Sequence, residues 1–243
     1  MHKPTQETPK LVSIVMPVYN GERYISGSIR AVVKTLTRYG IPHEVVVVDD
    51  GSSDGTRSKA LEVAAEHPNI KVVGHARNHG KGAAFLHGYR HSQGDVIVLF
   101  DADLDVPPQQ IPVLLAVMRG ARADVVITNK WHPLSRTRAT AIRKFLSKSF
   151  NALVRLLTGL NISDTQTGAK AIKRYVLDAI APKMYVKRYA FDVELLLLAA
   201  KHGYRIAEAP SLKTIKLTTA FRPREIFRML LELLSIAYRH GRV

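Results

Sequence analysis

The sequence predicts an α/β fold in which a mostly parallel β-sheet is flanked by helices. Up to about residue 128, short runs rich in valine and isoleucine alternate with amphipathic segments, and two of the strongest runs end in aspartates. Strands that are apolar on both faces and are joined through helices are typical of a parallel sheet covered on both sides.

The first half of the chain predicts five strands, at residues 11–18, 44–48, 70–73, 95–100 and 124–128. The helical period of the apolar residues predicts helices between them, at residues 22–39, 56–67 and 81–92. Gly40 and Pro42 interrupt the first helix. Pro107 and Pro108 are expected to open the helix before the fifth strand, because the first turn of a helix tolerates proline.

The pattern changes after residue 128. A basic stretch, residues 136–157, and a C-terminal stretch opened by Pro223 each have the apolar face of an amphipathic helix. Between them the sequence predicts a loop leading into a strand at residues 164–173 and a buried helix at residues 191–202.

We therefore expect residues 1–220 to form one domain that includes the basic helix, and residues 221–243 to form an appended amphipathic helix. Apolar faces bordered by Lys and Arg are expected of helices that lie in a membrane interface. Docking of the two helices onto the sheet or onto a partner subunit is the alternative.

The composition bounds the classes of function. The 243 residues include 36 Lys and Arg against 20 Asp and Glu, which gives a formal net charge of +16. This excess favours a polyanionic partner, which nucleic acid, phosphate ligands or an anionic membrane would each satisfy. The chain has no cysteine, which excludes a disulfide framework, a thiolate nucleophile and a Cys-ligated zinc.

The sequence contains no stretch that is apolar enough to span a bilayer. The longest segment without Asp, Glu, Lys or Arg covers only residues 106–118, whereas a spanning helix needs about 20 mostly apolar residues. Residues 1–10 are polar and lack the apolar centre of a signal peptide. The expectation is a soluble or peripheral protein on the cytoplasmic side of the membrane.

Three carboxylates follow the strand predicted at residues 95–100: Asp101, Asp103 and Asp105. In an open parallel sheet, ligands bind beyond the carboxyl ends of the strands. Clustered carboxylates repel one another unless a cation intervenes, and their hard oxygen atoms suit Mg²⁺ or Mn²⁺, which commonly bridge to substrate phosphates. A polar loop that only caps the next helix is the alternative.

Two further loops follow predicted strands. Residues 48–56 contain Asp49, Asp50 and a turn rich in Gly and Ser that can hydrogen-bond a nucleoside. Residues 78–82 place Lys81 between two glycines at the start of a helix, where it can meet a diphosphate. Ordinary turn and capping chemistry explains either loop alone. Three such loops at strand ends point together to a nucleotide ligand.

In this order the loops resemble the family 2 glycosyltransferases of the GT-A fold. The matching segments are residues 16–22, 47–56, 78–82 and 101–105. Residues 164–170, Asp-Thr-Gln-Thr-Gly-Ala-Lys, resemble the Asp-Thr-Gln-x-Gly-x-Lys segment of polyprenyl-phosphate glycosyltransferases, and residues 191–195 fit the same branch. The resemblance covers about residues 11–216 of the chain.

The resemblance implies a donor site for a nucleotide sugar, a UDP- or GDP-hexose. The residues that it places around this ligand are Pro17, Tyr19, Glu22, Asp49, Asp50, Lys81, Asp101 and Ala102. Asp101 and Asp103 would hold Mg²⁺ or Mn²⁺ against the diphosphate, with Asp105 assisting. Members of this branch often have glutamine where this chain has Asp105, so the site carries an additional negative charge here.

The resemblance also implies an acceptor site. Lys130, Arg143 and Ser147 match positions that grip the acceptor phosphate in related enzymes. Lys130 stands where the branch has arginine, and a lysine lacks the bidentate geometry of a guanidinium. Asp164 and Gln166 join Asp103 as the expected catalytic residues and would orient the sugar or a partner side chain.

The reaction implied is inverting transfer of glucose or mannose to a polyprenyl or dolichyl phosphate at the membrane surface. A phosphate monoester already carries an anionic oxygen near pH 7, since its second pKa is about 6, so it needs positioning more than deprotonation. Two alternatives stay open: a family 2 transferase with a glycan or glycolipid hydroxyl as acceptor, and a basic nucleic-acid-binding protein. The aspartates at strand ends argue against nucleic acid as the partner. A membrane partner subunit or a homo-oligomer is also left open.

Overall fold

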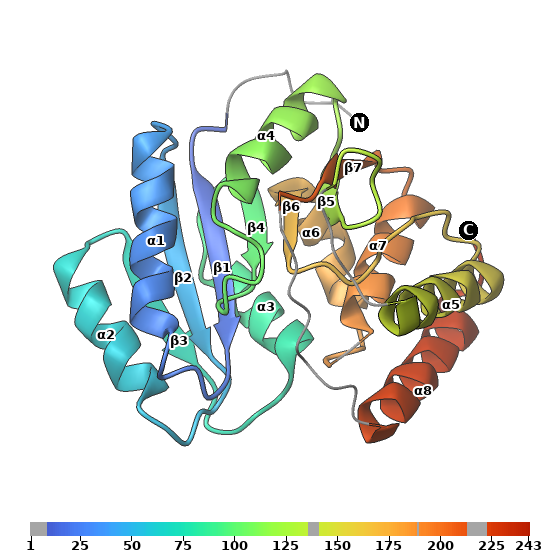
Figure 1. Ribbon diagram of the computed structural model, residues 1–243, viewed down its shortest axis with the longest axis horizontal. Helices are drawn as coiled ribbons and strands as arrows, with labels where there is room; N and C mark the ends of the chain where they lie inside the picture. Colours follow the sequence, from blue (N-terminus) through green and yellow to red (C-terminus); the bar gives the residue numbers. More distant parts are fainter. Residues whose placement is uncertain (1–8, 136–140, 189, 213–222) are drawn as a thin grey trace.

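The computed structural model of the chain describes residues 9–135, 141–188, 190–212 and 223–243. Seven strands among these residues form one mixed sheet in the order β3-β2-β1-β4-β6-β5-β7 (Figure 1). The strands are β1 Val12–Val18, β2 His43–Asp49, β3 Ile70–Gly74, β4 Val96–Phe100, β5 Val125–Asn129, β6 Ala169–Lys173 and β7 Ile206–Pro210. The five strands predicted in the first half of the chain are confirmed to within two residues at each end.

Strand β6 gives the sheet its mixed character. It is antiparallel to both of its neighbours, β4 and β5, whereas all other neighbouring strands are parallel. The register pairs Phe100, the last residue of β4, with Ala169, the first residue of β6. The loop that enters β6 therefore reaches the edge of the sheet where β4 ends.

The described helices are α1 Ile25–Arg38, α2 Thr56–Glu66, α3 Lys81–Arg90, α4 Gln110–Gly120, α5 Ala141–Thr158, α6 Arg174–Ile180, α7 Phe191–Lys201 and α8 Pro223–His240, with a 3₁₀ turn at Ala181–Lys183. Helix α1 starts later than predicted, because the N–H of Tyr24 first bonds the carbonyl of Gly21 in a turn. Helix α4 also starts later, since Pro107 and Pro108 lie in the turn that precedes it.

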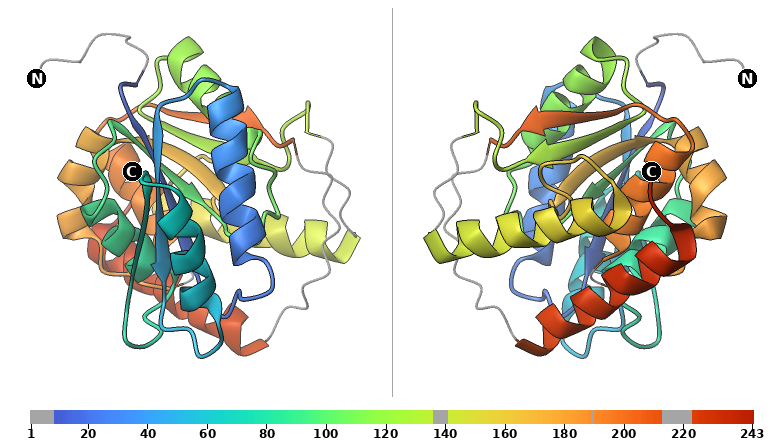
Figure 2. Two further views of the ribbon diagram at one scale, coloured as in Figure 1. Left: turned by 90° about the vertical axis from the view of Figure 1, so that its left-hand side faces the viewer. Right: turned by 90° about the vertical axis from the view of Figure 1, so that its right-hand side faces the viewer.

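The helices cover the two faces of the sheet with separate apolar cores. Helices α1, α2 and α4 pack on one face, and α3, α6 and α7 on the other, with the inner sides of α5 and α8 joining the second core (Figure 2). Alternate valines of β2 enter different cores: Val45 and Val47 face α1, whereas Val46 and Val48 face α3. This alternation explains why strand residues are apolar on both faces.

The two amphipathic helices lie against each other on one side of the molecule (Figure 2, right). Leu233 and Ile236 of α8 are completely buried, and α8 also contacts α7. Both helices are therefore docked on the domain through their inner faces. The predicted division near residue 220 falls among residues 213–222, outside the described part of the chain, and stays a prediction. No helix among the described residues is long and apolar enough to cross a membrane.

Replacing Phe85 by alanine tests the second core. Phe85 is completely buried between the sheet and α7, where its ring centroid lies 6.1 Å from that of Phe191. Loss of such a side chain typically costs about 3–5 kcal/mol. We expect the free energy of unfolding in urea to fall by about that amount, while Leu61→Ala on the exposed side of α2 changes it by no more than about 0.5 kcal/mol. Equal effects of the two substitutions would contradict this placement of Phe85.

Candidate active site

The loops after β1 and β2 brace each other at the carboxyl edge of the sheet. The N–H of Asn20 donates to Ser52 Oγ, and the N–H of Ser53 donates to Asn20 Oδ1, both at 2.9 Å. Asn20 has a φ of 52°, in the left-handed region that asparagine tolerates. Tyr19 is exposed beside this brace, and Pro17 is half-buried near the end of β1. Both are therefore placed where they can meet a ligand.

Glu22 and Asp49 fix the same two loops with their carboxylates. Glu22 Oε2 accepts the N–H of Gly55 at 3.1 Å, and Lys59 Nζ lies 3.2 Å from Glu22 Oε1. The Gly55 hydrogen bond, and after it the Lys59 contact, lower the pKa of Glu22 below its usual value. Asp49 is buried at the end of β2, where its Oδ1 accepts the N–H of Ser52 at 3.1 Å. Both carboxylates thus hold the loops after β1 and β2, Glu22 from the surface and Asp49 from the interior.

Asp50 joins the β2 loop to the loop that precedes α3. Its side chain is almost completely buried, and both of its oxygens already have protein partners. Oδ1 lies 2.8 Å from His75 Nδ1 and accepts the N–H of His79 at 3.0 Å, while Oδ2 accepts the N–H of Gly80 at 2.7 Å. Asp50 therefore supports the loop that carries Lys81.

Lys81 makes the closest charged contact of the proposed donor site. It begins α3, and its Nζ lies 2.6 Å from Asp101 Oδ1, just beyond the end of β4. Burial opposes the charge of Lys81, but the carboxylates of Asp101 and Asp192 outweigh it and raise the pKa of the ammonium above its usual value. Two of the predicted donor residues, far apart in sequence, are thus brought together as an ion pair.

The segment that enters β6 packs directly against Asp101. The N–H of Asp101 donates to the carbonyl of Gly168 at 2.9 Å. A methyl group added to Gly168 would lie 2.6 Å from Asp101 Oδ2, far inside van der Waals contact. Only glycine leaves the carboxylate of Asp101 in its present position. This contact explains why a glycine follows the Asp-Thr-Gln-Thr run of residues 164–167.

The aspartate cluster itself is held by an unusual turn. Leu104 has a φ of 53°, a left-handed conformation that costs a bulky residue on the order of 1–3 kcal/mol. Its N–H bonds the carbonyl of Asp101 at 3.4 Å, and the N–H of Asp105 donates to Asp103 Oδ1 at 2.9 Å. Ala102 is buried beneath the turn. The strained turn presents Asp103 and Asp105 at the edge of the sheet.

The carboxylates of Asp101 and Asp103 are chemically suited to a divalent cation. In the part of the chain that the structure describes, no three His, Asp or Glu side chains are grouped so that they could hold a metal ion by themselves. Mg²⁺ is usually bound through one or two carboxylates, with substrate phosphates and water completing the shell. The donor set therefore fits a metal that binds together with a diphosphate.

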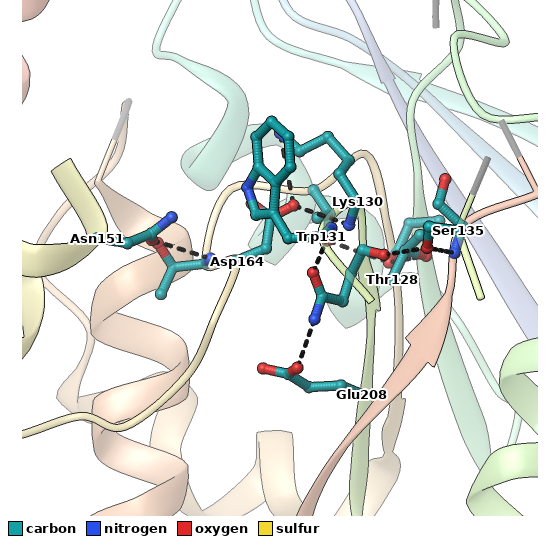
Figure 3. Close-up of polar contacts among 12 residues, drawn as sticks. Thr128, Lys130, Trp131, Ser135, Asn151, Asp164 and Glu208 are labelled. Atoms are coloured by element: carbon teal, nitrogen blue, oxygen red, sulfur yellow. Dashed lines mark hydrogen bonds and ion pairs between the residues drawn. The ribbon is translucent and has the colours of Figure 1, made fainter. Parts of the chain in front are cut away.

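Lys130, predicted to contact the acceptor phosphate, and Asp164, predicted to be catalytic, are also brought together next to the end of β5 (Figure 3). Asp164 Oδ2 accepts the N–H of Lys130 at 3.2 Å and lies 3.5 Å from Lys130 Nζ. Asp164 is almost completely buried, and this burial raises its pKa above the usual value, although Lys130 and Lys170 counteract part of the effect. Asp164 therefore holds both the backbone and the ammonium group of Lys130.

A set of hydrogen bonds holds the Lys130 loop in place (Figure 3). Asn129 Nδ2 donates to Glu208 Oε2 at 2.6 Å, and Asn129 Oδ1 accepts the N–H of Trp131 at 2.7 Å. Ser135 Oγ donates to the carbonyl of Asn129 at 2.7 Å. The loop after β5 is thus fixed to β7, so that Lys130 projects from a rigid support.

The remaining predicted residues lie on or beside the amphipathic helices. Gln166 Nε2 is 3.0 Å from Met229 Sδ of α8, and Ser147 is half-buried in α5. Arg143 belongs to α5, but its side chain lies outside the described residues. The roles predicted for these three residues stay predictions.

Sequence reasoning gave no role to Lys170 and Asp192, which form a buried ion pair behind the site. Lys170 is completely buried, with Nζ 3.0 Å from Asp192 Oδ1 and 2.7 Å from the carbonyl of Thr167. Burial lowers the pKa of Lys170 against the opposing pull of Asp192. The available signal was a lysine inside the apolar strand Ala169–Lys173, because a buried lysine needs an acidic partner.

Comparison with known proteins agrees with this arrangement. Residues 13–181 match the family described as "Glycosyl transferase family 2". The chain is 31% identical over 223 residues to dolichyl-phosphate beta-glucosyltransferase ALG5C of Trichomonas vaginalis, covering 85% of this chain and 65% of that protein. It is 37% identical over 175 residues to undecaprenyl-phosphate 4-deoxy-4-formamido-L-arabinose transferase of Aeromonas hydrophila, covering 70% of this chain and 51% of that protein. The chain thus spans about half to two thirds of the length of these relatives.

The fold is shared with a solved structure, that of glucosyl-3-phosphoglycerate synthase from Mycobacterium tuberculosis in complex with Mg²⁺ and UDP. The TM-score is 0.74 at 19% sequence identity, and the match covers all of this chain and 86% of the other. The mixed sheet with helices on both faces is therefore the GT-A fold. Since the family match extends over more than half of its residues, the chain belongs to glycosyltransferase family 2.

Proposed function

We propose that the protein transfers a hexose, glucose or mannose, from a UDP- or GDP-sugar to a polyprenyl phosphate, with inversion at the anomeric carbon. The observation that carries this proposal is the contact between Gly168 and Asp101, which joins the segment typical of polyprenyl-phosphate transferases to the aspartate cluster. Two relatives are named as transferases that act on dolichyl phosphate and undecaprenyl phosphate. Their names support the same class of acceptor here.

The donor half of the site supplies a nucleoside pocket and a charged diphosphate site. The braced loops after β1 and β2 present the exposed side chain of Tyr19 to the base and ribose, and the buried carboxylate of Asp49 holds the β2 loop beside it. Lys81 can bind the diphosphate, because it begins α3 and its ammonium group lies beside Asp101, one of the residues assigned to the metal. Mg²⁺ or Mn²⁺ would be held by Asp101 and Asp103 and would offset the charge that develops on the leaving diphosphate. A solved structure of this fold holds Mg²⁺ and UDP.

The acceptor half of the site positions an anionic oxygen. Lys130, which is fixed by Asp164 and the Asn129 hydrogen bonds, provides a cation for the acceptor phosphate. In the proposed step, that phosphate oxygen attacks the anomeric carbon as the bond to the diphosphate breaks, and the diphosphate leaves with the electron pair. The attacking oxygen carries no proton near pH 7, so the chain has to orient it more than deprotonate it.

The outer face of α8 supports a membrane location. Phe227, Leu231, Leu234 and Tyr238 are 63%, 51%, 53% and 92% exposed, and their spacing puts them on one stripe of the helix. The exposed arginines near this stripe are Arg228, Arg239 and Arg242. An apolar stripe bordered by cations suits a surface of anionic lipids, in which a polyprenyl phosphate resides. Peripheral attachment on the cytoplasmic face, as predicted from the sequence, is part of the proposal.

The transfer reaction is tested by a screen of UDP- and GDP-glucose and -mannose against short polyprenyl phosphates, with Mg²⁺ or Mn²⁺. We expect one pair to release nucleoside diphosphate and form a glycosylated lipid, and we expect chelation by EDTA to stop both. Asp103→Ala is expected to abolish turnover, because it removes one of the two carboxylates assigned to the metal. The control is Asp178→Asn, whose carboxylate instead accepts a hydrogen bond from Tyr89. Turnover by Asp103→Ala at the wild-type rate would refute the metal assignment.

Gly168→Ala separates activity from stability. The added methyl group displaces the carboxylate of Asp101, the flexible end of a side chain, so the fold can absorb it while the donor site is distorted. A misplacement of about 1 Å can cost about 10²-fold in rate. We expect turnover to fall on that order while the melting temperature stays near that of the wild type. The control is Gly120→Ala, where nothing lies within 4 Å of the added methyl group. Full activity of Gly168→Ala would contradict the role proposed for the contact between Gly168 and Asp101.

Sedimentation with liposomes tests the membrane location. At low salt the protein is expected to bind liposomes that contain anionic lipids, and to bind more weakly as salt screens the arginines. The double substitution Leu231→Gln and Leu234→Gln should weaken binding by about tenfold or more, because each leucine loses apolar surface that would enter the interface. Leu61→Gln, at an exposed position of α2, is the matched control. Absence of binding by the wild type at low salt would count against this part of the proposal.

A further inference from the structure

A row of four histidine rings lies beside the donor site and has no part in the proposed chemistry. His75 contacts His79 with ring centroids 4.8 Å apart and His87 at 4.7 Å, and His87 contacts His91 at 4.5 Å. Burial lowers the pKa of His87 below its usual value, with smaller contributions from His91 and His75. The row therefore acts as a packed support that holds the ring of His75 from two sides.

The supported ring of His75 points at a buried carboxylate. Its Nδ1 lies 2.8 Å from Asp50 Oδ1, and an ionised carboxylate only accepts hydrogen bonds, so Nδ1 is the donor. His75 is also fixed through its backbone, since its N–H donates to the carbonyl of Asp49 at 2.9 Å. Asp50 is thus oriented by a ring that is itself immobilised.

Asp50 passes this orientation to the donor loop, residues 78–81. Its two oxygens accept the backbone N–H groups of His79 and Gly80, at 3.0 and 2.7 Å. Gly80 has a φ of 100°, which is available to glycine but strained for other residues, and Lys81 follows directly as the first residue of α3. The two hydrogen bonds that Asp50 accepts therefore hold the backbone directly before the first turn of α3, which begins with Lys81.

The other side of the loop is held by the segment before α7. Arg188 Nη1 donates to Asn78 Oδ1 at 3.2 Å, and the carbonyl of Lys187 accepts the N–H of Ala83 at 3.1 Å. A methyl group on Gly80 would lie 2.5 Å from Arg188 Cγ, so the loop has no room to move in that direction. The loop is thus held by Asp50 as well as by the segment before α7.

We propose that His75 and Asp50 form a positioning pair for the nucleotide diphosphate: His75 orients Asp50, and Asp50 places the donor loop so that Lys81 meets both Asp101 and the ligand. The inference rests on the proposed use of a nucleotide sugar and adds a role for a histidine that does not touch the substrate. It assigns Asp50 to support of the loop instead of direct contact with the nucleotide. His75 acts on donor binding first, because the loop that it supports carries Lys81, whereas Lys130 and Asp164 belong to the loops after β5 and before β6.

Titration calorimetry of UDP and GDP with Mg²⁺ or Mn²⁺ tests the pair. His75→Ala and Asp50→Asn should each raise the dissociation constant of the nucleotide that the wild type binds by about tenfold, the usual size of the loss of a hydrogen bond to a charged group. In turnover, KM for the donor should rise while KM for the acceptor stays within about twofold. His75→Gln, which retains a side-chain N–H donor, should recover part of the affinity. His91→Ala, at the exposed end of the row, should bind as the wild type does.

Hydrogen exchange of the ligand-free protein provides a second readout. In His75→Ala, the amides of His79 and Gly80 should exchange at least about tenfold faster, since their acceptor is no longer held. Wild-type nucleotide affinity together with unchanged exchange in His75→Ala would overturn the proposal. If His75→Ala fails to fold, the comparison is made with His75→Gln and Asp50→Asn. If the wild type binds neither nucleotide, the proposed function fails, and exchange at these two amides decides the positioning role by itself.

Discussion

The candidate active site depends on the close approach of Gly168 to Asp101. The carbonyl of Gly168 accepts the N–H of Asp101, and the absence of a side chain at Gly168 leaves room for the carboxylate. Asp101 in turn pairs with Lys81, which links the aspartate cluster to the start of α3. This contact therefore ties the segment that enters β6 to the donor half of the site.

Two ion pairs lie near this contact, one at the edge of the sheet and one in the interior. Lys81 and Asp101 pair at the edge of the sheet, whereas Lys170 and Asp192 pair in the interior behind them. Removing one partner of a buried pair leaves an uncompensated charge, which typically costs about 3–5 kcal/mol. Because Lys170 lies in β6 and Asp192 in the first turn of α7, the interior pair fixes these two elements relative to each other. It supports the site without touching a ligand.

Sequence patterns predicted the sheet of the first half well, because buried parallel strands and their helices have local signatures. The aspartates after β2 and β4 also lie at the strand ends where the motifs indicated, whereas the ion pair of Lys130 with Asp164 has no signature in the sequence. The antiparallel insertion of β6 was not foreseen, since pairing across the sheet leaves no local periodicity. The contacts of Asp50 could not be predicted either, because the sequence does not distinguish an aspartate that binds a ligand from one that accepts backbone N–H groups.

The place of β6 in the chain also affects when the active site can be completed. Strand β6 pairs with β4 across the whole of α4, β5 and α5, just as β1 pairs with β4 across β2 and β3. Contacts between distant segments form slowly, because the intervening chain has to be ordered first. The residues of the donor half all precede β5 in the chain, whereas Gly168 can reach Asp101 only after β5 and α5 have been synthesised. A partly folded chain would carry the donor loops before it carried a complete active site.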